Sequence, residues 1–321
     1  MAKFFNVAGA CNPKKHYMVN LESRLASIKE MVDREEYFTI NKGRQYGKTT
    51  ILRALTDYLK DDYEVISLDF QRLEVTAFEN TQSFVIAFLT DVLYLHSNIP
   101  DEIIGKLKKL INSKNRTNSL QILFQILSLW CKESEKPIVL IIDEVDSASN
   151  NQVFLDFLAQ LRAGYLSRDT IPTFQSVILA GVYDIRNIRR KIRPDEEHKH
   201  NSPWNIAAKF RIEMHFSKEE IKVMLGDYEK DYSTGMNIDE MSSLLYNYTS
   251  GYPYLVSWFC KCMDEELCED YGFSNKSSAW TKEGFLKAHK ILIEEKNPLF
   301  ESLIGKFELY PELKKLISSY K

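Results

Sequence analysis

The chain has 321 residues, of which 44% are hydrophobic and 27% are charged, and its formal net charge is −3. The composition is typical of a globular protein with about two domains. The slightly acidic balance excludes binding to nucleic acid through the charge of the whole chain, although it leaves a local basic patch open.

The first half of the chain alternates helical and strand patterns. Residues 20–34 repeat apolar side chains at helical spacing, and residues 37–41 (YFTIN) are a short run rich in β-formers. After a turn that contains glycine, residues 49–62 again carry one apolar helical stripe. The order of strand, turn and helix is the setting that a phosphate-binding loop requires.

That turn ends in Gly47-Lys48-Thr49, as in the phosphate-loop pattern G-x-x-x-x-G-K-[ST]. The pattern places its first glycine at position 42, where this chain has lysine and a glycine follows one step later. We therefore predict a nucleotide site with a variant first turn, whose bulky side chains point away from the phosphates. Lys48 is expected to reach the terminal phosphates, and the Thr49 hydroxyl to coordinate Mg²⁺. The residues predicted to surround the nucleotide are Gly43, Arg44, Gln45, Tyr46, Gly47, Lys48, Thr49 and Thr50.

Residues 63–71 are a second buried-strand pattern, and after two helical patterns five apolar residues, 138–142, run into Asp143-Glu144. This is the Walker B arrangement. Its strand would carry Asp143 to the edge beside the phosphate loop, where the carboxylate can hold Mg²⁺. Glu144 would point the other way along the strand period and orient a water for attack on the γ-phosphate. The alternative is an acidic pair that merely ends a strand, and the preceding phosphate loop argues against it.

A helical pattern at FLDFLAQLRAGYL precedes a further strand pattern over residues 174–184, which is expected beside the strand that ends at Asp143. Gly181, Val182 and Tyr183 occupy its tip, so we do not expect a polar γ-phosphate sensor there. Basic residues then crowd the segment Arg186–Arg193. We interpret them first as a solvated basic face; an arginine finger or a contact with nucleic acid is the alternative.

From residue 217 onward every pattern is helical. Ser217 and Glu220 have the spacing of a capping box, which predicts a helix start. The tail of the chain is also helical in pattern and would begin a further, incomplete module. We predict three segments: a P-loop core over 1–215, a helical lid over 216–290 and a helical tail over 291–321.

The five cysteines are irregularly spaced and predict neither a disulfide framework nor a zinc site. Cys260 and Cys262 lie in a helical pattern and are interpreted as core residues rather than metal ligands. We expect a reducing, cytoplasmic location. No apolar run approaches the ~18 residues that span a bilayer, so we expect no membrane partner.

With both nucleotide motifs and a helical C-terminal region, the sequence resembles the AAA-like P-loop ATPases of the STAND and origin-recognition branch. It looks closest to a bacterial group described as AAA-like domain proteins. The stretches that carry the resemblance are HYMVNLESRL, INKGRQYGKTT, VLIIDEVD, NSPWNIAAKF and TSGYPYLVSWFC.

The resemblance implies an α/β P-loop NTPase core of the additional-strand, AAA+-like type, with a parallel sheet in the order 5-1-4-3-2 and an all-helical lid. It also implies that Pro253, in Gly251-Tyr252-Pro253, sits over the adenine, and that Tyr17 and Met18 border the base. Without the family, Gly251-Tyr252-Pro253 is a turn that starts a helix. The choice of ATP over GTP rests on the resemblance alone.

Together these features predict an Mg²⁺-dependent ATPase with slow turnover, acting as a switch whose lid closes on ATP. Its expected catalytic residues are Lys48 and Glu144, and its expected partners are ATP or ADP and either another protein or a second copy. Two other functions stay open: a nucleotide-dependent DNA-binding, mobile-element or defence-associated module, and a scaffold that holds ATP without hydrolysing it. A small-molecule kinase ranks below them, because Glu144 beside Asp143 suits activation of water better than transfer to a substrate.

Overall fold

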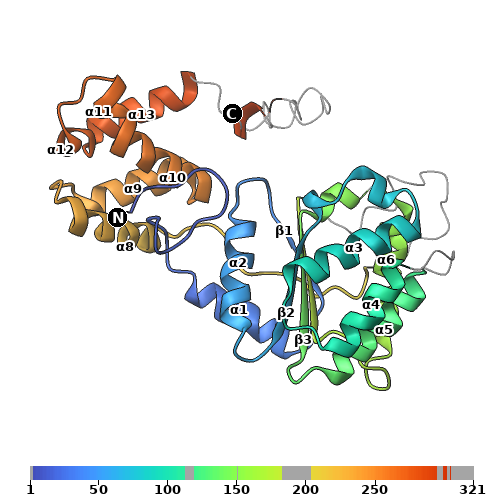
Figure 1. Ribbon diagram of the computed structural model, residues 1–321. Helices are drawn as coiled ribbons and strands as arrows, with labels where there is room; N and C mark the ends of the chain where they lie inside the picture. Colours follow the sequence, from blue (N-terminus) through green and yellow to red (C-terminus); the bar gives the residue numbers. More distant parts are fainter. Residues whose placement is uncertain are drawn as a thin grey trace. The chain divides into compact units, whose positions relative to one another are not determined.

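A computed structural model describes residues 3–112, 119–149, 151–182, 204–294, 299–301 and 304. The chain divides into two compact units (Figure 1). We call the first the α/β unit; it comprises Leu21–Gly43 and Ile51–Glu213. We call the second the helical unit; it comprises Met1–Asn20, Arg44–Thr50 and Met214–Lys321.

The α/β unit is built on four parallel strands in the order β1-β4-β3-β2. The strands are β1 (Phe38–Asn41), β2 (Glu64–Asp69), β3 (Ile138–Asp143) and β4 (Ser176–Gly181). The pairing of β3 with β4 places the strand that ends at Asp143 beside the strand predicted at 174–184, as expected. Every residue of β3 and β4 is buried, which is typical of the inner strands of a parallel sheet.

Because both faces of the inner strands are buried, helices must cover both sides of the sheet. Figure 1 shows α1 and α2 on one face and α3, α4, α5 and α6 on the other. These helices are α1 (Glu22–Asp33), α2 (Lys48–Leu59), α3 (Thr81–Leu95), α4 (Asp101–Asn112), α5 (Leu120–Glu133) and α6 (Gln152–Leu166). α4, which was not predicted from the sequence, follows Pro100 and has two acidic residues in its first turn.

The fifth strand implied by the resemblance is not a strand in the part of the chain that the structure describes. In its place, residues 204–208 return to the free edge of β1. Ala208 forms a single parallel bridge with Phe38. The Trp204 indole N–H donates to the Thr39 hydroxyl at 2.8 Å, and the indole is fully buried. Within the described residues, the sheet therefore has four strands and one bridging residue along this edge.

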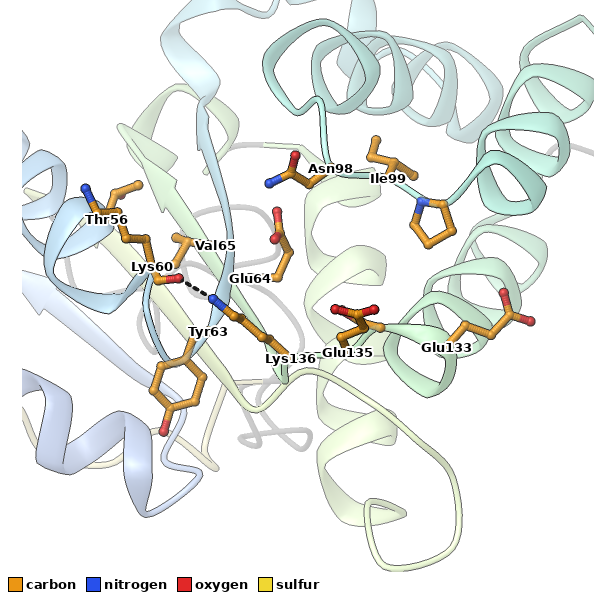
Figure 2. A pocket seen from close by; sticks show the side chains of 12 residues that line it. Thr56, Lys60, Tyr63, Glu64, Val65, Asn98, Ile99, Glu133, Glu135 and Lys136 are labelled. Carbon is orange, nitrogen blue, oxygen red and sulfur yellow. Dashed lines mark hydrogen bonds between the residues drawn. The ribbon is translucent and has the colours of Figure 1, made fainter.

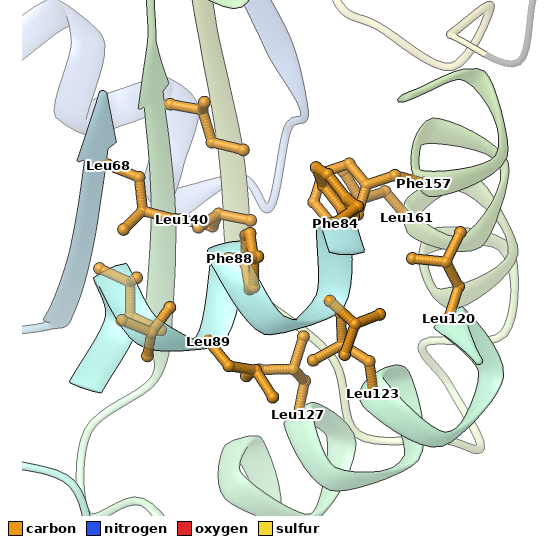
Figure 3. Close-up of a cluster of buried hydrophobic side chains, with 14 of the residues drawn as sticks. Leu68, Phe84, Phe88, Leu89, Leu120, Leu123, Leu127, Leu140, Phe157 and Leu161 are labelled. Atoms are coloured by element: carbon orange, nitrogen blue, oxygen red, sulfur yellow. The ribbon is translucent and has the colours of Figure 1, made fainter. Parts of the chain in front are cut away.

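Phenylalanine rings and leucine side chains pack together in the core on the side of the sheet that α3–α6 cover (Figure 3). Phe157 of α6 is fully buried, and its ring centroid lies 5.3 Å from that of Phe84 and 5.5 Å from that of Phe88. Leu68 and Leu140 bring the sheet into the same cluster. Phe157 therefore links α6 to α3 at the centre of this core.

The helical unit contains only helices and turns between residues 217 and 294. Its helices are α8 (Lys218–Tyr232), α9 (Ile238–Thr249), α10 (Pro253–Lys261), α11 (Leu267–Asp270), α12 (Lys276–Ala279) and α13 (Lys282–Glu294), with a π-helical turn at Cys262–Glu266. The predicted capping box forms, because the Ser217 hydroxyl accepts from the Glu220 N–H and the Glu220 carboxylate accepts from the Ser217 N–H. Among the described helices, none has both the length and the apolar character needed to cross a bilayer.

A buried charge lies inside the helical unit. The Asp264 carboxylate is almost fully buried, and it accepts hydrogen bonds from the Tyr228 hydroxyl and the Lys276 ammonium group. The Trp280 indole N–H in turn donates to the Tyr228 oxygen at 2.9 Å. A buried carboxylate is tolerated only when it is paired in this way. Cys260, predicted as a core residue, is fully buried in the same unit.

Replacing the central aromatic residue of the α/β core tests this account of its packing. Phe157→Ala is expected to lower the free energy of unfolding by about 3–5 kcal/mol, because it removes a large buried ring and leaves a cavity. Phe157→Leu keeps most of the volume and should cost clearly less. Denaturant unfolding of the purified chain measures both values. Equal, small losses for the two variants would contradict the central place given to this ring.

Candidate functional site

The segment predicted to bind phosphate comprises residues 43–50, of which Gly43 belongs to the α/β unit and Arg44–Thr50 to the helical unit. Gln45 and Gly47 take the left-handed conformation, with φ of +59° and +78°. Helix α2 begins at Lys48, whose side chain is buried. Left-handed residues just before a helix start bring backbone N–H groups to one side of a loop, which is the geometry that cradles an anion. A non-glycine residue such as Gln45 in this conformation is strained, and such strain is typical of functional loops.

The N-terminal segment packs in the same unit. The Thr50 hydroxyl accepts a hydrogen bond from the Cys11 N–H at 3.0 Å. Tyr17 is buried, its ring lies 5.0 Å from that of Phe5, and its hydroxyl donates to Asp231 at 2.5 Å. Burial and the Asp231 carboxylate raise the pKa of Tyr17. Among the residues expected to border the base, Tyr17 is therefore anchored to α8, and Met18 beside it is half-buried.

The Gly251-Tyr252-Pro253 stretch forms the turn that starts α10. Gly251 has a φ of +71°, and its carbonyl accepts from the Phe216 N–H at 2.8 Å. A Cβ on Gly251 would lie 1.9 Å from the Phe216 carbonyl oxygen, so only glycine fits. Pro253 is buried at the first position of α10, where a missing N–H costs nothing.

Two tyrosines and a histidine meet at the phosphate-loop segment. The Tyr252 hydroxyl donates to the Arg44 carbonyl oxygen. The Tyr46 ring packs edge-on against the Tyr252 ring with centroids 4.4 Å apart, and a 2.6 Å hydrogen bond joins the Tyr46 hydroxyl to His215 Nε2. Burial raises the pKa of Tyr252 to about 12, so its hydroxyl remains a donor at neutral pH. Neither the contact of His215 nor the role of the Tyr252 hydroxyl was predicted from the sequence.

The residues predicted to form the Walker B motif lie in the α/β unit, at the carboxyl end of β3. Asp143 is buried, and in the strand register it lies opposite Asp69 of β2. Burial, together with the Asp143 carboxylate, raises the pKa of Asp69. Two neighbouring carboxylates at one strand edge create a negative site, which favours a cation or a proton.

The expectation that Glu144 follows the strand alternation is corrected. β3 ends at Asp143, and Glu144 has a φ of +52°, so it belongs to a left-handed turn rather than to the strand. Its N–H donates back to the Asp143 carboxylate at 2.9 Å. The turn that begins at Glu144, and not the period of the strand, sets the direction of its side chain.

Asp146 is a second residue that the sequence analysis missed. Its carboxylate accepts from the Val182 N–H, just beyond the end of β4. A Cβ on Gly181 would lie 3.0 Å from the same carboxylate oxygens, so a side chain there would crowd the contact. The tip of β4 is thus held by a carboxylate from the turn after β3. Tyr183 and the arginine cluster Arg186–Arg193 lie outside the described residues.

A surface pocket of about 680 Å³ opens elsewhere in the α/β unit (Figure 2). It is lined at the amino end of β2 by Glu64, whereas Asp69 marks the opposite end of that strand. The Lys136 ammonium group donates to the Lys60 carbonyl at 2.8 Å, and burial raises the pKa of Glu64. No residue of the predicted nucleotide site lines this pocket.

Parallel strands with helices on both faces, a glycine-lysine-threonine loop that opens a helix after β1, and an acidic residue at the end of the buried strand β3 define an AAA+-like P-loop fold. A family model for the AAA-like domain matches residues 14–279, so the chain belongs to the AAA-like domain family.

Solved structures agree with this fold. The chain is similar to the Walker-type ATPase PABY2304 of Pyrococcus abyssi, with 16% identity and a TM-score of 0.56, covering 96% of this chain and 80% of that one. It is also similar to the ORC2 protein of Aeropyrum pernix in its ADP form, with 13% identity and a TM-score of 0.50, covering 88% of this chain and 70% of that one. No curated protein matches. At these identities the similarity concerns the fold.

Gly251, in the turn just before α10, gives a test with a matched control. Gly251→Ala is expected to lower the free energy of unfolding by at least about 2 kcal/mol, because it adds left-handed strain and a clash with Phe216. Gly226→Ala lies inside α8, where an added Cβ meets nothing within 4 Å, and should raise stability by up to about 1 kcal/mol. Denaturant unfolding measures both; equal effects would contradict the structural role of Gly251.

The carboxylate pair at the strand ends predicts a pH-dependent effect. The folded pKa of Asp69 lies above the ordinary value of 3.8, so its stabilising contribution is complete below that value and is lost as the pH rises through the folded pKa. Asp69→Asn removes the titrating carboxyl group, and with it this loss of stability at higher pH. The variant should match the wild-type chain at acid pH and become the more stable of the two at neutral pH. Denaturant unfolding across the pH range measures the difference, and a difference that does not change with pH would contradict the assignment.

Proposed function

We propose that this chain binds Mg-ATP and hydrolyses it slowly, as a switch whose helical unit responds to the nucleotide. The observation that carries the proposal is the turn between β1 and α2, in which left-handed Gln45 and Gly47 precede a helix that opens on the buried Lys48. Membership of the AAA-like domain family and the AAA+-like fold support ATP as the ligand.

In this proposal the loop backbone N–H groups from Gly43 to Thr50 surround the phosphates, and Lys48 contacts the terminal ones. Tyr17, Met18 and Pro253 border the base. A lysine in this position neutralises charge that builds up on the transferred phosphoryl group, so removing it weakens both binding and turnover.

Mg²⁺ would be held by Thr49 and Asp143. Oxygen donors of this kind fit the ion, which takes only one or two protein ligands when phosphate oxygens supply others. The position of Asp69 opposite Asp143 supports a cation preference at the end of β3, because an added positive charge relieves the repulsion between the two carboxylates. Bound Mg²⁺ would draw charge from the leaving phosphate oxygens.

Glu144 is proposed as the group that orients the attacking water. Its place in a left-handed turn immediately after the strand supports this role, since strained residues concentrate where side chains must be aimed. A scaffold that holds ATP without hydrolysis is the second candidate, and the assay below separates the two. A reducing, cytoplasmic location stays a prediction.

Release of phosphate from Mg-ATP by the purified chain tests the proposal. Lys48→Ala is expected to abolish both binding and turnover, because the phosphates lose their lysine contact. Glu144→Gln is expected to keep binding and to lower turnover at least about 100-fold, because the water loses its general base.

Calorimetric titration of each variant with Mg-ATP is the control for that assay. If the wild-type chain binds Mg-ATP through Lys48 but releases no phosphate, the scaffold function replaces the ATPase. If Lys48→Ala leaves binding unchanged, the assignment of the phosphate loop is wrong.

A further inference from the structure

The phosphate-loop segment of the helical unit is in contact with two helix starts that follow it by more than 160 residues in the chain. Tyr46 pairs with His215, two residues before the N-cap of α8, and Arg44 pairs with Tyr252, the N-cap of α10. These contacts involve three aromatic side chains and one backbone carbonyl. None of the three side chains occupies a fixed position of the phosphate-loop pattern.

The Tyr252 hydroxyl fixes the orientation of one peptide group. Peptide bonds are planar and, in the described residues, all trans, so the carbonyl of Arg44 and the N–H of Gln45 point in opposite directions. Because Tyr252 donates to that carbonyl, the Gln45 N–H faces away from Tyr252. A rotated peptide would remove that N–H from the side it now faces and would also release Tyr252.

Tyr46 is the second anchored residue of the loop, and it is held through its side chain. Its ring is packed edge-on against Tyr252, and its hydroxyl is joined to His215 at 2.6 Å. Gln45 lies between the two anchored residues in a strained left-handed conformation. Such a conformation persists only when its surroundings fix it, and the anchors on both sides of Gln45 supply that constraint.

We propose that Tyr46, His215 and Tyr252 form an aromatic clamp that sets the conformation of the phosphate loop and couples nucleotide occupancy to the starts of α8 and α10. The three residues are positioning residues: they act through the loop backbone. The coupling rests on the proposed nucleotide binding, whereas the hold on the loop does not. By linkage, a nucleotide that prefers the clamped loop must also stabilise the clamp.

The first experiment uses the nucleotide-free chain. Hydrogen exchange of the backbone amides at residues 44–50 is expected to become about 3- to 10-fold faster in Tyr252→Phe and in Tyr46→Phe, because each variant loses one hydrogen bond and keeps its ring. Tyr58→Phe, at a partly exposed tyrosine on α2, is the matched control and should change nothing. Unchanged exchange at 44–50 in both clamp variants would overturn the clamp.

The second experiment adds Mg-ATP. Affinity measured by calorimetry should fall about 3- to 10-fold in each clamp variant. Tyr46→Phe and His215→Gln remove the same hydrogen bond, so the double variant should lose no more affinity than the weaker-binding of the two single variants. Protection of the first turn of α10 by nucleotide should appear in the wild-type chain and disappear in Tyr252→Phe. A purely structural role would lower thermal stability without moving this protection.

The two proposals fail differently. If the wild-type chain does not bind Mg-ATP but the clamp variants loosen residues 44–50, the proposed function and the coupling are overturned and the hold on the loop stands. If Mg-ATP binds equally well to the wild-type chain and the clamp variants, and protects α10 in all of them, the coupling is overturned and the proposed function stands.

Discussion

Burial of both faces of β3 is the constraint on which the α/β unit depends. A strand with every residue buried needs an apolar layer on each side, and α1–α6 provide those layers. Its polar end can then appear only where the strand leaves the core. Asp143 stands at that point, and the parallel register brings Asp69 to the same edge. The negative site is thus a consequence of how the core is closed.

The alternation of strands and helices was predictable from sequence because each element carries its own local pattern. β3 and β4 are continuous apolar runs, and Ser217 with Glu220 marks the start of α8 by spacing alone. The four-strand sheet was harder to foresee. Whether residues 204–208 form a strand or one bridge depends on how Trp204 docks beside β1, and no local pattern encodes that docking.

In the candidate site, too, the features with a local sequence pattern could be predicted, whereas contacts between distant residues could not. The glycine-lysine-threonine ending is a local signal, and it led directly to the loop before α2. The partners of that loop could not be predicted, because Tyr46 and His215 are separated by 169 residues and Arg44 and Tyr252 by 208. The strand period could not be extended to Glu144 for a related reason: strand alternation holds only inside a strand, and the backbone turns left-handed at that residue.

The placement of the buried tryptophans has a practical consequence. Trp204 packs against Tyr37 in the α/β unit, and Trp280 packs against Tyr228 in the helical unit; both indoles are almost completely shielded from water. Trp130 is also buried in the α/β unit, and Trp258 is half-buried in the helical unit. Each unit therefore contains its own intrinsic fluorophores, whose emission shifts to longer wavelength when water reaches them. A chain whose units lose structure at different denaturant concentrations would show two emission steps, so fluorescence alone can reveal whether they unfold as one cooperative body.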